Sequence, residues 1–438
     1  MTTSITRLQF RYSGKLADLG EADRRRLFDR TGTREPAIAD VVAKIIERVR
    51  TDGDSALRQL ARELDSVELE ALEVPSARIE AAYARVSPAL RSAMRRSAAN
   101  LERVHSAFVP AASEIEVEPG LIVGRRPDPL DRVGVYAPGG SASYASSVLM
   151  GAVPARAAGV REVVVCCPPA ADGFPSDIVL AAARIAGVDR VFSLGGAGAI
   201  AAMAFGTETV PRVDRIVGPG NAYVAEAKLQ LTGSVAIDSP AGPSELLIIA
   251  DEGASAECVA REAIAQAEHD SRAVILVLAL GPETASRIRE AIAMAVETAP
   301  RRDIIIQSFA GNGGVLDAGD IATAIDASNR FAPEHLLIAT RDPGAVLPRV
   351  RNAGTVFLGQ TTSVVFGDYI TGANHVLPTG GLARSYSGLS TLDYFRWTTY
   401  QRASAQAAAS LAGDAAIFAE SEGLPSHAAA ARAAEAKR

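Results

Sequence analysis

Residues 132–166 read RVGVYAPGGSASYASSVLMGAVPARAAGVREVVVC, and this stretch decides the fold class. Apolar runs at its two ends, 132–136 and 162–166, have the length and the valine content of buried strands. Between them, Pro138-Gly-Gly140 predicts a turn, and the alanine-rich residues 145–158 predict a helix. Strand, helix and strand in this order are typical of a βαβ unit with two parallel strands.

The same alternation continues along the chain after this unit. It predicts further strands at residues 190–193, 212–217, 245–249, 273–277, 303–307 and 335–339. Helices are expected between them at 178–186, 197–205, 222–231, 255–268, 283–298 and 321–329. The turn-rich residues 239–243 interrupt the alternation and form the best internal domain boundary. The sequence therefore predicts an α/β fold with two units, each with its own parallel sheet.

Outside this region, helical periodicity dominates. Residues 36–64 and 79–108 carry apolar side chains at intervals of three and four, which predicts two long helices. Residues 115–123 alternate like a strand. The tail from Asp393 onward is rich in alanine and is expected to be helical, with an interruption at Gly423-Leu-Pro425.

The composition is that of an ordinary globular protein, with 438 residues, 48% apolar and 22% charged. A net charge of −6 and 5% aromatic residues give no indication of a nucleic-acid-binding surface. Cys166, Cys167 and Cys258 form no CxxC motif, which favours a reducing compartment. No secretory signal and no uncharged apolar run of about 18 residues is visible. We therefore expect a cytoplasmic protein without nucleic-acid or membrane partners.

Four of the five histidines stand beside another group that can bind a metal or carry a proton. Gln266 and His269 lie three residues apart on one face of a helix, close enough to share a small ligand or a metal. Histidine is a good zinc ligand, whereas a glutamine amide oxygen is an unusual one. The alternative for His269 is a cation that caps the C-terminus of the helix.

Acidic groups accompany two other histidines. Glu334 and His335 are adjacent, so that one can activate water while the other removes a hydroxyl proton. The alternative for this pair is a charged entrance to a strand. Asp368 precedes His375 in a loop with two glycines, where the carboxylate is a candidate ligand or part of an Asx-type turn.

Two further segments are informative. Glu422 and His427 lie five residues apart, at a break between helices that can also be simple surface structure. Gly218-Pro-Gly-Asn221 falls between a strand and a helix, where backbone N–H groups can bind the pyrophosphate of a cofactor. No GxGxxG fingerprint occurs. From the residues alone, a dehydrogenase and a metallohydrolase built around one metal both remain open.

Taken together and in order, these motifs resemble the histidinol dehydrogenase family from about residue 40 to residue 427. The matching segments are Val133-Gly-Val-Tyr-Ala-Pro-Gly-Gly140, Gly218-Pro-Gly-Asn221, Pro240-Ala-Gly-Pro-Ser-Glu245, Gln266-Ala-Glu-His269, Ala332-Pro-Glu-His335, Gly367-Asp-Tyr369 with Asn374-His-Val-Leu-Pro378, and Glu422-Gly-Leu-Pro-Ser-His427. The resemblance implies oxidation of L-histidinol through L-histidinal to L-histidine, the last step of histidine biosynthesis, with two NAD⁺ and one Zn²⁺.

The resemblance also implies a role for each matching residue. The zinc ligands are Gln266, His269, Asp368 and His427. His335 would take the hydroxyl proton, and Glu334 would activate water onto the bound aldehyde. The substrate site comprises these six side chains together with Ser244, His375 and Glu422. Tyr136 and Asn221 match positions that contact the cofactor.

Members of the family have two incomplete Rossmann-like domains and form intertwined homodimers. The resemblance implies that Glu422 and His427 complete the site of the partner subunit. The expected domains are an N-terminal arm at 1–34, a discontinuous domain at 35–132 and 245–390 with the zinc and catalytic residues, a cofactor domain at 133–244, and a helical dimerisation tail at 391–438.

The chain departs from the family pattern at Gly198, where many members carry glutamine, and we expect weaker contact with NAD there. One alternative is a paralogue that oxidises another polar alcohol, such as a sulfonated diol. Glu422 argues against it, because a carboxylate suits an ammonium group and repels a sulfonate. A zinc metallohydrolase without cofactor binding is a second alternative. A non-catalytic scaffold is the third, but it has no need of Glu334, His335 and four candidate ligands.

Overall fold

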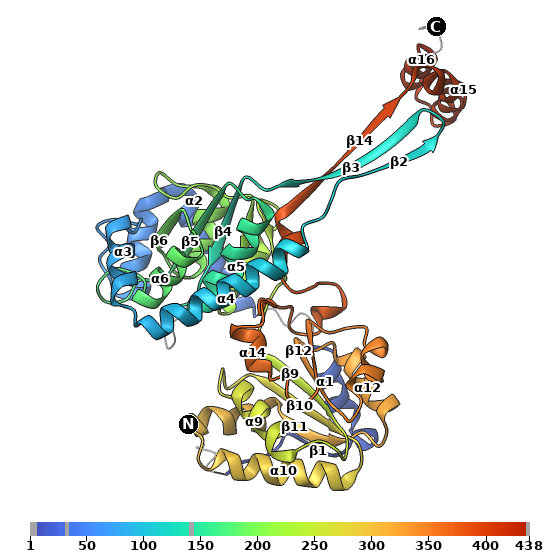
Figure 1. Ribbon diagram of the computed structural model, residues 1–438. Helices are drawn as coiled ribbons and strands as arrows, with labels where there is room; N and C mark the ends of the chain where they lie inside the picture. The colour runs from blue at the N-terminus through green and yellow to red at the C-terminus, as the bar shows by residue number, and fades with distance from the viewer. Residues whose placement is uncertain (1–6, 31–34, 140–143, 435–438) are drawn as a thin grey trace.

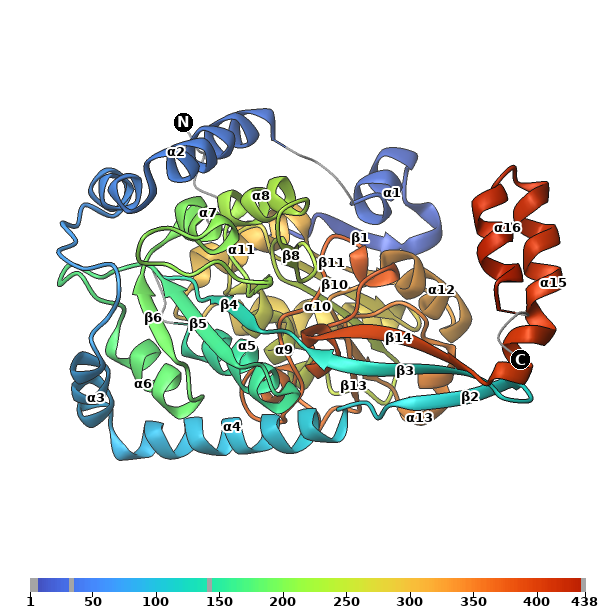
Figure 2. The same ribbon diagram turned by 90° about the horizontal axis from the view of Figure 1, so that it is seen from above.

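A computed structural model describes residues 7–30, 35–139 and 144–434. Two parallel sheets form the body, and a three-stranded antiparallel ribbon projects from it and carries the C-terminal helices (Figure 1). This is the α/β class that the sequence predicts. Seen from above, α2 and α4 run along opposite sides of the body, and the ribbon leaves at one end (Figure 2). No helix in the described ranges is both long and apolar enough to cross a bilayer.

The first sheet has the parallel strand order β6-β5-β4-β7-β8. Its strands are β4 (Arg132–Tyr136), β5 (Glu162–Cys167), β6 (Arg190–Ser193), β7 (Arg215–Val217) and β8 (Ala236–Ile237). Its helices are α5 (Ala145–Ala158), α6 (Asp177–Ile185), α7 (Gly196–Phe205) and α8 (Ala222–Leu231). The chain runs outward from β4 to β6 and then returns to β7 on the other side of β4. The strand order therefore reverses between β4 and β7, where open α/β sheets bind their ligands.

The second sheet repeats this order as β11-β10-β9-β12-β13 and adds β1 (Tyr12–Lys15) at its edge. Its other strands are β9 (Glu245–Ala250), β10 (Val274–Ala279), β11 (Gly314–Asp317), β12 (His335–Ala339) and β13 (Thr355–Leu358). Its helices include α9 (Ala256–Ala267), α10 (Pro282–Val296), α11 (Arg302–Asn312), α12 (Ile321–Phe331), α13 (Pro343–Val346) and α14 (Val364–Tyr369). The chain passes from the first sheet to the second between β8 and β9, at the turn-rich segment expected as the boundary.

The N-terminal third is distributed differently from the expected domains. The arm contributes β1 and α1 (Glu21–Phe28) to the second sheet, where Leu27 and Phe28 pack against Phe331. Helices α2 (Pro36–Leu60), α3 (Ser76–Arg85) and α4 (Pro88–Ala107) cover the first sheet instead. The predicted grouping of 35–132 with 245–390 is therefore wrong, because helical periodicity shows that one face is buried but not which sheet covers it.

Two element assignments also differ from the prediction. Residues 303–307 form part of helix α11 rather than a strand, and Ile305, Ile306 and Phe309 are buried at helical spacing. The strand next to them is β11, which the sequence analysis missed. The long helix expected at 79–108 is two helices, because Pro88 begins α4 and the Ser87 side chain accepts a hydrogen bond from the backbone N–H of Leu90.

The tail is helical only beyond its first strand. Strand β14 (Phe395–Ala403) pairs along all nine residues with β3 (Leu121–Pro129), which also pairs with β2 (Ser113–Glu118). Helices α15 (Ala405–Ser421) and α16 (Pro425–Arg432) follow at the end of this ribbon, away from both sheets (Figure 1). Residues 395–403 were predicted as helix, and this part of the prediction is wrong.

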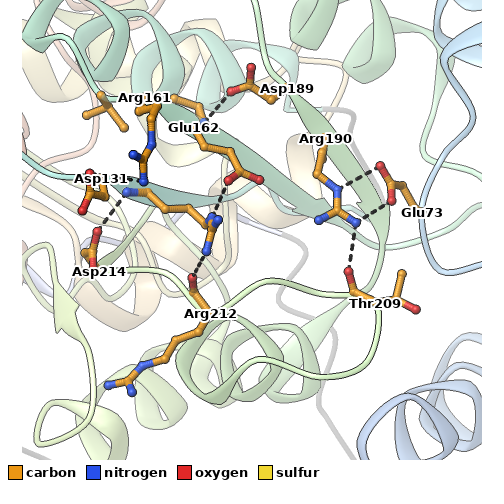
Figure 3. Close-up of polar contacts among 12 residues, drawn as sticks. Glu73, Asp131, Arg161, Glu162, Asp189, Arg190, Thr209, Arg212 and Asp214 are labelled. Atoms are coloured by element: carbon orange, nitrogen blue, oxygen red, sulfur yellow. Dashed lines mark hydrogen bonds and ion pairs between the residues drawn. The ribbon is translucent and has the colours of Figure 1, made fainter.

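Ion pairs close the amino edge of the first sheet (Figure 3). Arg132 at the start of β4 contacts Glu162 at the start of β5, with Nε and Oε2 2.6 Å apart. Arg190 at the start of β6 binds Glu73 through both carboxylate oxygens. The opposite, carboxyl edge of this sheet is left to face the second sheet, and the candidate site lies there.

Candidate active site

A pocket of about 350 Å³ lies between the carboxyl edge of the first sheet and the amino edge of the second. The first sheet contributes Pro138 and Gly139 after β4 and residues 219–221 after β7. The second sheet contributes residues 241–244, which precede β9, and Glu334, which precedes β12. Eight expected site residues line this one pocket: Asn221, Ser244, Gln266, His269, Glu334, His335, Asp368 and His375.

The backbone of Glu245 holds the two expected catalytic side chains. Its N–H donates to Glu334 Oε2 at 2.7 Å, and its carbonyl oxygen accepts from His335 Nδ1 at 3.0 Å. The register explains the second contact, because His335 lies opposite Leu246 in the parallel pairing of β12 with β9. Because Nδ1 donates to a carbonyl, Nε2 is the ring nitrogen of His335 that can release or take up a proton.

Two carboxylates face His335. Glu334 Oε2 is 3.4 Å from Nδ1, and Asp368 Oδ1 is 3.6 Å from Nε2. Burial lowers the pKa of His335, but the charges of Glu334 and Asp368 outweigh it and raise this pKa to about 10. For Asp368, burial raises the pKa, whereas the neighbouring histidines, His335 foremost, bring it below its usual value. Asp368 is therefore an ionised carboxylate, as a metal ligand must be.

Three of the four expected zinc ligands share the pocket. Gln266 is buried in the last turn of α9, His269 follows that helix, and Asp368 comes from α14. Their amide oxygen, imidazole and carboxylate are all groups that can bind zinc, so the donor set fits a metal that needs one more ligand. No group of three or more His, Cys, Asp and Glu suited to a metal occurs in the described part of the chain. The expected set supplies only His269 and Asp368 of these types here.

His375 and Ser244 complete the second-sheet side of the pocket. His375 Nδ1 donates to the backbone carbonyl of Asp368 at 2.9 Å, which leaves Nε2 for a ligand. Burial lowers the pKa of His375, so the ring is neutral. The carbonyl of Ser244 accepts from the backbone N–H of Val274 at 2.9 Å, which ties the residue just before β9 to the start of β10.

The first-sheet side presents mainly backbone. Asn221 caps α8, because its side-chain oxygen accepts from the N–H groups of Tyr223 and Val224. Gly218 has a φ of 111°, and a Cβ there would stand 2.1 Å from the carbonyl oxygen of Tyr136. Only glycine fits this approach between β7 and β4.

A buried ion pair stands behind this turn. Lys228 binds Asp238 and the carbonyl oxygen of Gly218, and Asp238 accepts from the N–H of Gly218 at 2.7 Å. The side chains of Lys228 and Asp238 are only 5% and 3% exposed. This pair is not recognisable in the sequence, since a lysine and an aspartate ten residues apart carry no motif.

Tyr136 and Gly198 lie behind the pocket rather than in its lining. The Tyr136 hydroxyl is buried and accepts from the backbone N–H of Gly196 at 3.1 Å, which ties β4 to the start of α7. A Cβ at position 198 would meet Leu60 and Leu57 of α2, at 3.0 and 3.6 Å. This position therefore faces a contact between helices. The loop after Pro138-Gly139 continues into residues 140–143, outside the described residues.

The last two expected site residues are not at the pocket of their own chain. Glu422 and His427 are exposed on the tail, at the end of α15 and in α16. Figure 1 shows these helices at the far end of the ribbon. If they contribute to a site, it is a site on another copy of the chain.

Comparisons with known proteins agree with one another. The sequence model of the family described as "Histidinol dehydrogenase" matches residues 28–434. The chain is 45% identical to the histidinol dehydrogenase of Methanosarcina barkeri over 95% of this chain and 96% of that protein. It is 46% identical to that of Xylella fastidiosa, over 91% of each protein. The crystal structure of histidinol dehydrogenase from Elizabethkingia anophelis is similar with a TM-score of 0.91, 33% identity and 97% coverage of both chains.

Proposed function

The chain belongs to the histidinol dehydrogenase family, whose members are oxidoreductases of histidine biosynthesis, and we propose on this premise that it oxidises L-histidinol to L-histidine with two NAD⁺ and one Zn²⁺. One observation carries the proposal. A proton acceptor and a second carboxylate, His335 and Glu334, are held by one backbone residue in a pocket that also contains an amide, an imidazole and a carboxylate suited to zinc.

The two side chains take different steps. In the first, His335 would accept the hydroxyl proton of L-histidinol as the carbinol carbon loses a hydride, for which NAD⁺ would be the acceptor, so that L-histidinal and NADH form. In the second, Glu334 would take a proton from water as the water oxygen attacks the aldehyde carbon, and the former carbonyl oxygen would take up a proton to complete the hydrate. The carbon of the hydrate would then lose a hydride, for which a second NAD⁺ would be the acceptor, and the two hydroxyl protons would pass to solvent, which leaves the carboxylate of histidine. Two hydrides leave one carbon, so two NADH form per substrate.

Gln266, His269 and Asp368 would hold the zinc, together with His427 of the partner subunit. A bound cation would supply an anchor for the imidazole and amine of the substrate, and it would offset the Asp368 charge that raises the His335 pKa. His375 and Ser244, with Glu422 of the partner subunit, would contact the substrate directly. A neutral His375 suits this role because it adds no positive charge beside a cationic substrate.

The cofactor would lie against the first sheet. The turn at 218–221 leads into the N-terminus of α8 beside the pocket, where backbone N–H groups and the helix dipole favour a pyrophosphate. Asn221 would contact the cofactor there. Tyr136 would act indirectly, by fixing β4 against α7. The reaction consumes a soluble alcohol and NAD⁺, which fits the cytoplasmic location that the sequence predicts.

The tail would form the dimer. Ile417 and Phe418 on α15 are 65% and 68% exposed, and Leu424 is 40% exposed. Large apolar side chains clustered at the end of a projecting ribbon are suited to burial against another subunit. This pairing would bring Glu422 and His427 to the pocket of the partner.

The first test measures NADH by absorbance with NAD⁺, zinc-loaded protein and limiting L-histidinol. Two NADH per histidinol, lost on chelation and restored by Zn²⁺, are expected. One NADH would show that the reaction stops at the aldehyde. If folded, zinc-loaded protein forms no NADH from histidinol but does so from a sulfonated diol, the paralogue assignment replaces ours.

The second test addresses the shared site. Chains with His427→Ala and chains with His335→Ala are each expected to be inactive as pure dimers. In each mixed dimer one intact pocket meets one intact tail, so one of its two sites should recover, which is about a quarter of all sites in a 1:1 random mixture. Inactivity of mixed dimers, with mixing verified by mass, would show that each chain uses its own tail.

A further inference from the structure

Arg30, in the N-terminal arm, makes a buried set of contacts behind the candidate active site. Its guanidinium forms an ion pair with Glu245, and its Nη2 donates to the carbonyl oxygen of Phe331 at 2.6 Å. The same guanidinium lies 3.5 Å from the centre of the Phe331 ring, in a cation–π contact. The side chains of Arg30 and Glu245 are only 10% and 4% exposed.

These contacts reach the two segments that hold the catalytic side chains. Glu245 is the residue whose backbone binds both Glu334 and His335. Phe331 ends α12, three residues before Glu334. Between them, Ala332 has a φ of 52°, a left-handed conformation that a residue with a Cβ rarely adopts. Arg30 therefore bridges the start of β9 and a strained turn that leads directly into the catalytic pair.

The charges of this pair are incompletely satisfied. Glu245 Oε1 also accepts from the N–H of Gly380 at 2.8 Å, but Glu245 Oε2 and Arg30 Nε are buried without a hydrogen-bond partner. Burial lowers the pKa of Arg30, and the charge of Glu245 works against this shift. A buried ion pair seldom adds net stability compared with apolar side chains of the same size. Its contribution here is better explained by the geometry that it fixes.

We infer that Arg30 is a positioning residue, which acts through Glu245 and Phe331 to hold Glu334 and His335 in their reactive arrangement. This inference rests on the proposed function. Arg30 does not line the candidate active-site pocket; it lines an adjoining cavity of about 820 Å³ that shares residues 241–243 with that pocket. Its contacts reach the catalytic pair through Glu245 and Phe331. Loss of the guanidinium contacts with Glu245 and Phe331 should therefore change how fast the bound substrate reacts rather than how tightly the substrate binds.

Both oxidation steps should slow together. His335 serves the first step and Glu334 the second, yet both depend on the same backbone residue. A displacement of catalytic groups by about 1 Å can lower a rate by about a hundredfold. For Arg30→Gln we expect kcat to fall by about tenfold to a hundredfold, from L-histidinol and from L-histidinal alike, with little change in KM or in zinc content.

The experiment compares three variants of the full-length, zinc-loaded enzyme. Arg30→Gln removes the charge and the fork, and Arg30→Lys keeps the charge but cannot reach Glu245 and Phe331 as a fork. Arg24→Gln is the matched control. Arg24 also lies in the arm and donates to the carbonyls of Leu19, Leu16 and Ala17, without contact to Glu245. We expect wild-type kcat for Arg24→Gln, partial activity for Arg30→Lys and the lowest kcat for Arg30→Gln.

The outcomes separate this inference from the proposed function. Wild-type protein must first give two NADH per histidinol, and its failure to do so bears on the function alone. With an active wild type, a folded Arg30→Gln enzyme with unchanged kcat overturns the inference, and so does a fall limited to one of the two steps. If Arg30→Gln does not fold, Glu245→Gln weakens the same ion pair from the other side and should lower both rates in the same proportion.

Discussion

The two sheets of the body share one strand order but use opposite edges. In the first sheet, the pocket lies at the carboxyl ends of β4 and β7, where the strand order reverses. In the second, the order reverses between β9 and β12, yet the pocket lies at the amino ends of these strands. Topology alone therefore predicts one of the two faces of this site and misplaces the other.

The loops explain the difference. At the carboxyl ends of β9 and β12, Asp251 accepts from the backbone N–H groups of Gly253 and Arg341, at 2.9 and 2.8 Å. A carboxylate thus takes the donors that a phosphate would need. In the first sheet, the acid behind the turn, Asp238, is paired with Lys228, and residues 219–221 remain in the pocket lining. The local charge would therefore favour an anionic ligand at the first crevice over the second.

The two sheets also contribute different kinds of groups to the two halves of the pocket, one half from each sheet. The first sheet offers glycine-rich backbone, whereas the second offers titratable side chains held by Glu245. Variants in the two halves should consequently differ in which kinetic constant they change. This division can be tested separately in each half.

The largest effect is expected in the second-sheet half of the pocket, which contains Glu334 and His335. His335→Asn should lower kcat with L-histidinol by about 10²- to 10⁴-fold, because it removes the proton acceptor of the first step. Glu334→Gln should slow the second step by a similar factor, so that early turnovers release one NADH per histidinol. Stopped-flow absorbance measures both rates through NADH formation. NAD⁺ titration by calorimetry measures cofactor binding in the same variants. Weakened NAD⁺ binding in either folded variant would contradict the division between the halves.

A smaller effect is expected in the first-sheet half of the pocket. Lys228→Met leaves the Asp238 carboxylate buried without its cation, which should cost about 3–5 kcal/mol of unfolding free energy. The turn at 218–221 then loses its support, so KM for NAD⁺ should rise while kcat at saturating NAD⁺ stays near wild type. Denaturant unfolding and steady-state kinetics measure both.

The double variant Lys228→Met/Asp238→Asn serves as the control for that measurement. It removes both charges, and the asparagine oxygen can still accept from the N–H of Gly218. It should regain most of the lost stability. If KM for NAD⁺ is unchanged in the single variant, the ion pair does not support the cofactor turn.

The sequence predicted the α/β units well because their strands and helices are set by local periodicity. Helices at 145–158 and 222–231 end within the residues expected. Errors arose where distant contacts decide the structure. Ile304, Ile305 and Ile306 have strong β propensity, but residues 302–312 form a helix because its buried face packs beside β10. Strand 395–403 is recognisable only beside its partner 121–129.

The candidate site shows the same limit. The motifs identified the side chains of the pocket, since acid, imidazole and amide types at short spacing carry the chemistry. They did not show how these side chains are held. Glu245 binds Glu334 and His335 across 89 and 90 positions of sequence, through backbone atoms that every residue possesses. Such contacts follow from strand register, which a single sequence does not display.

The smallest effect tests the closed crevice of the second sheet. Asp251→Asn keeps one oxygen acceptor but loses the charge that strengthens the contacts with Gly253 and Arg341, which should cost about 1–2 kcal/mol of unfolding free energy. KM for NAD⁺ and kcat should not change, because Asp251 does not line the pocket. If calorimetry instead shows tighter binding of NAD⁺, or binding of a second NAD⁺, this crevice can bind the cofactor once its carboxylate is neutralised. In that case the aspartate, rather than the shape of the loops, is what restricts the cofactor to the first sheet.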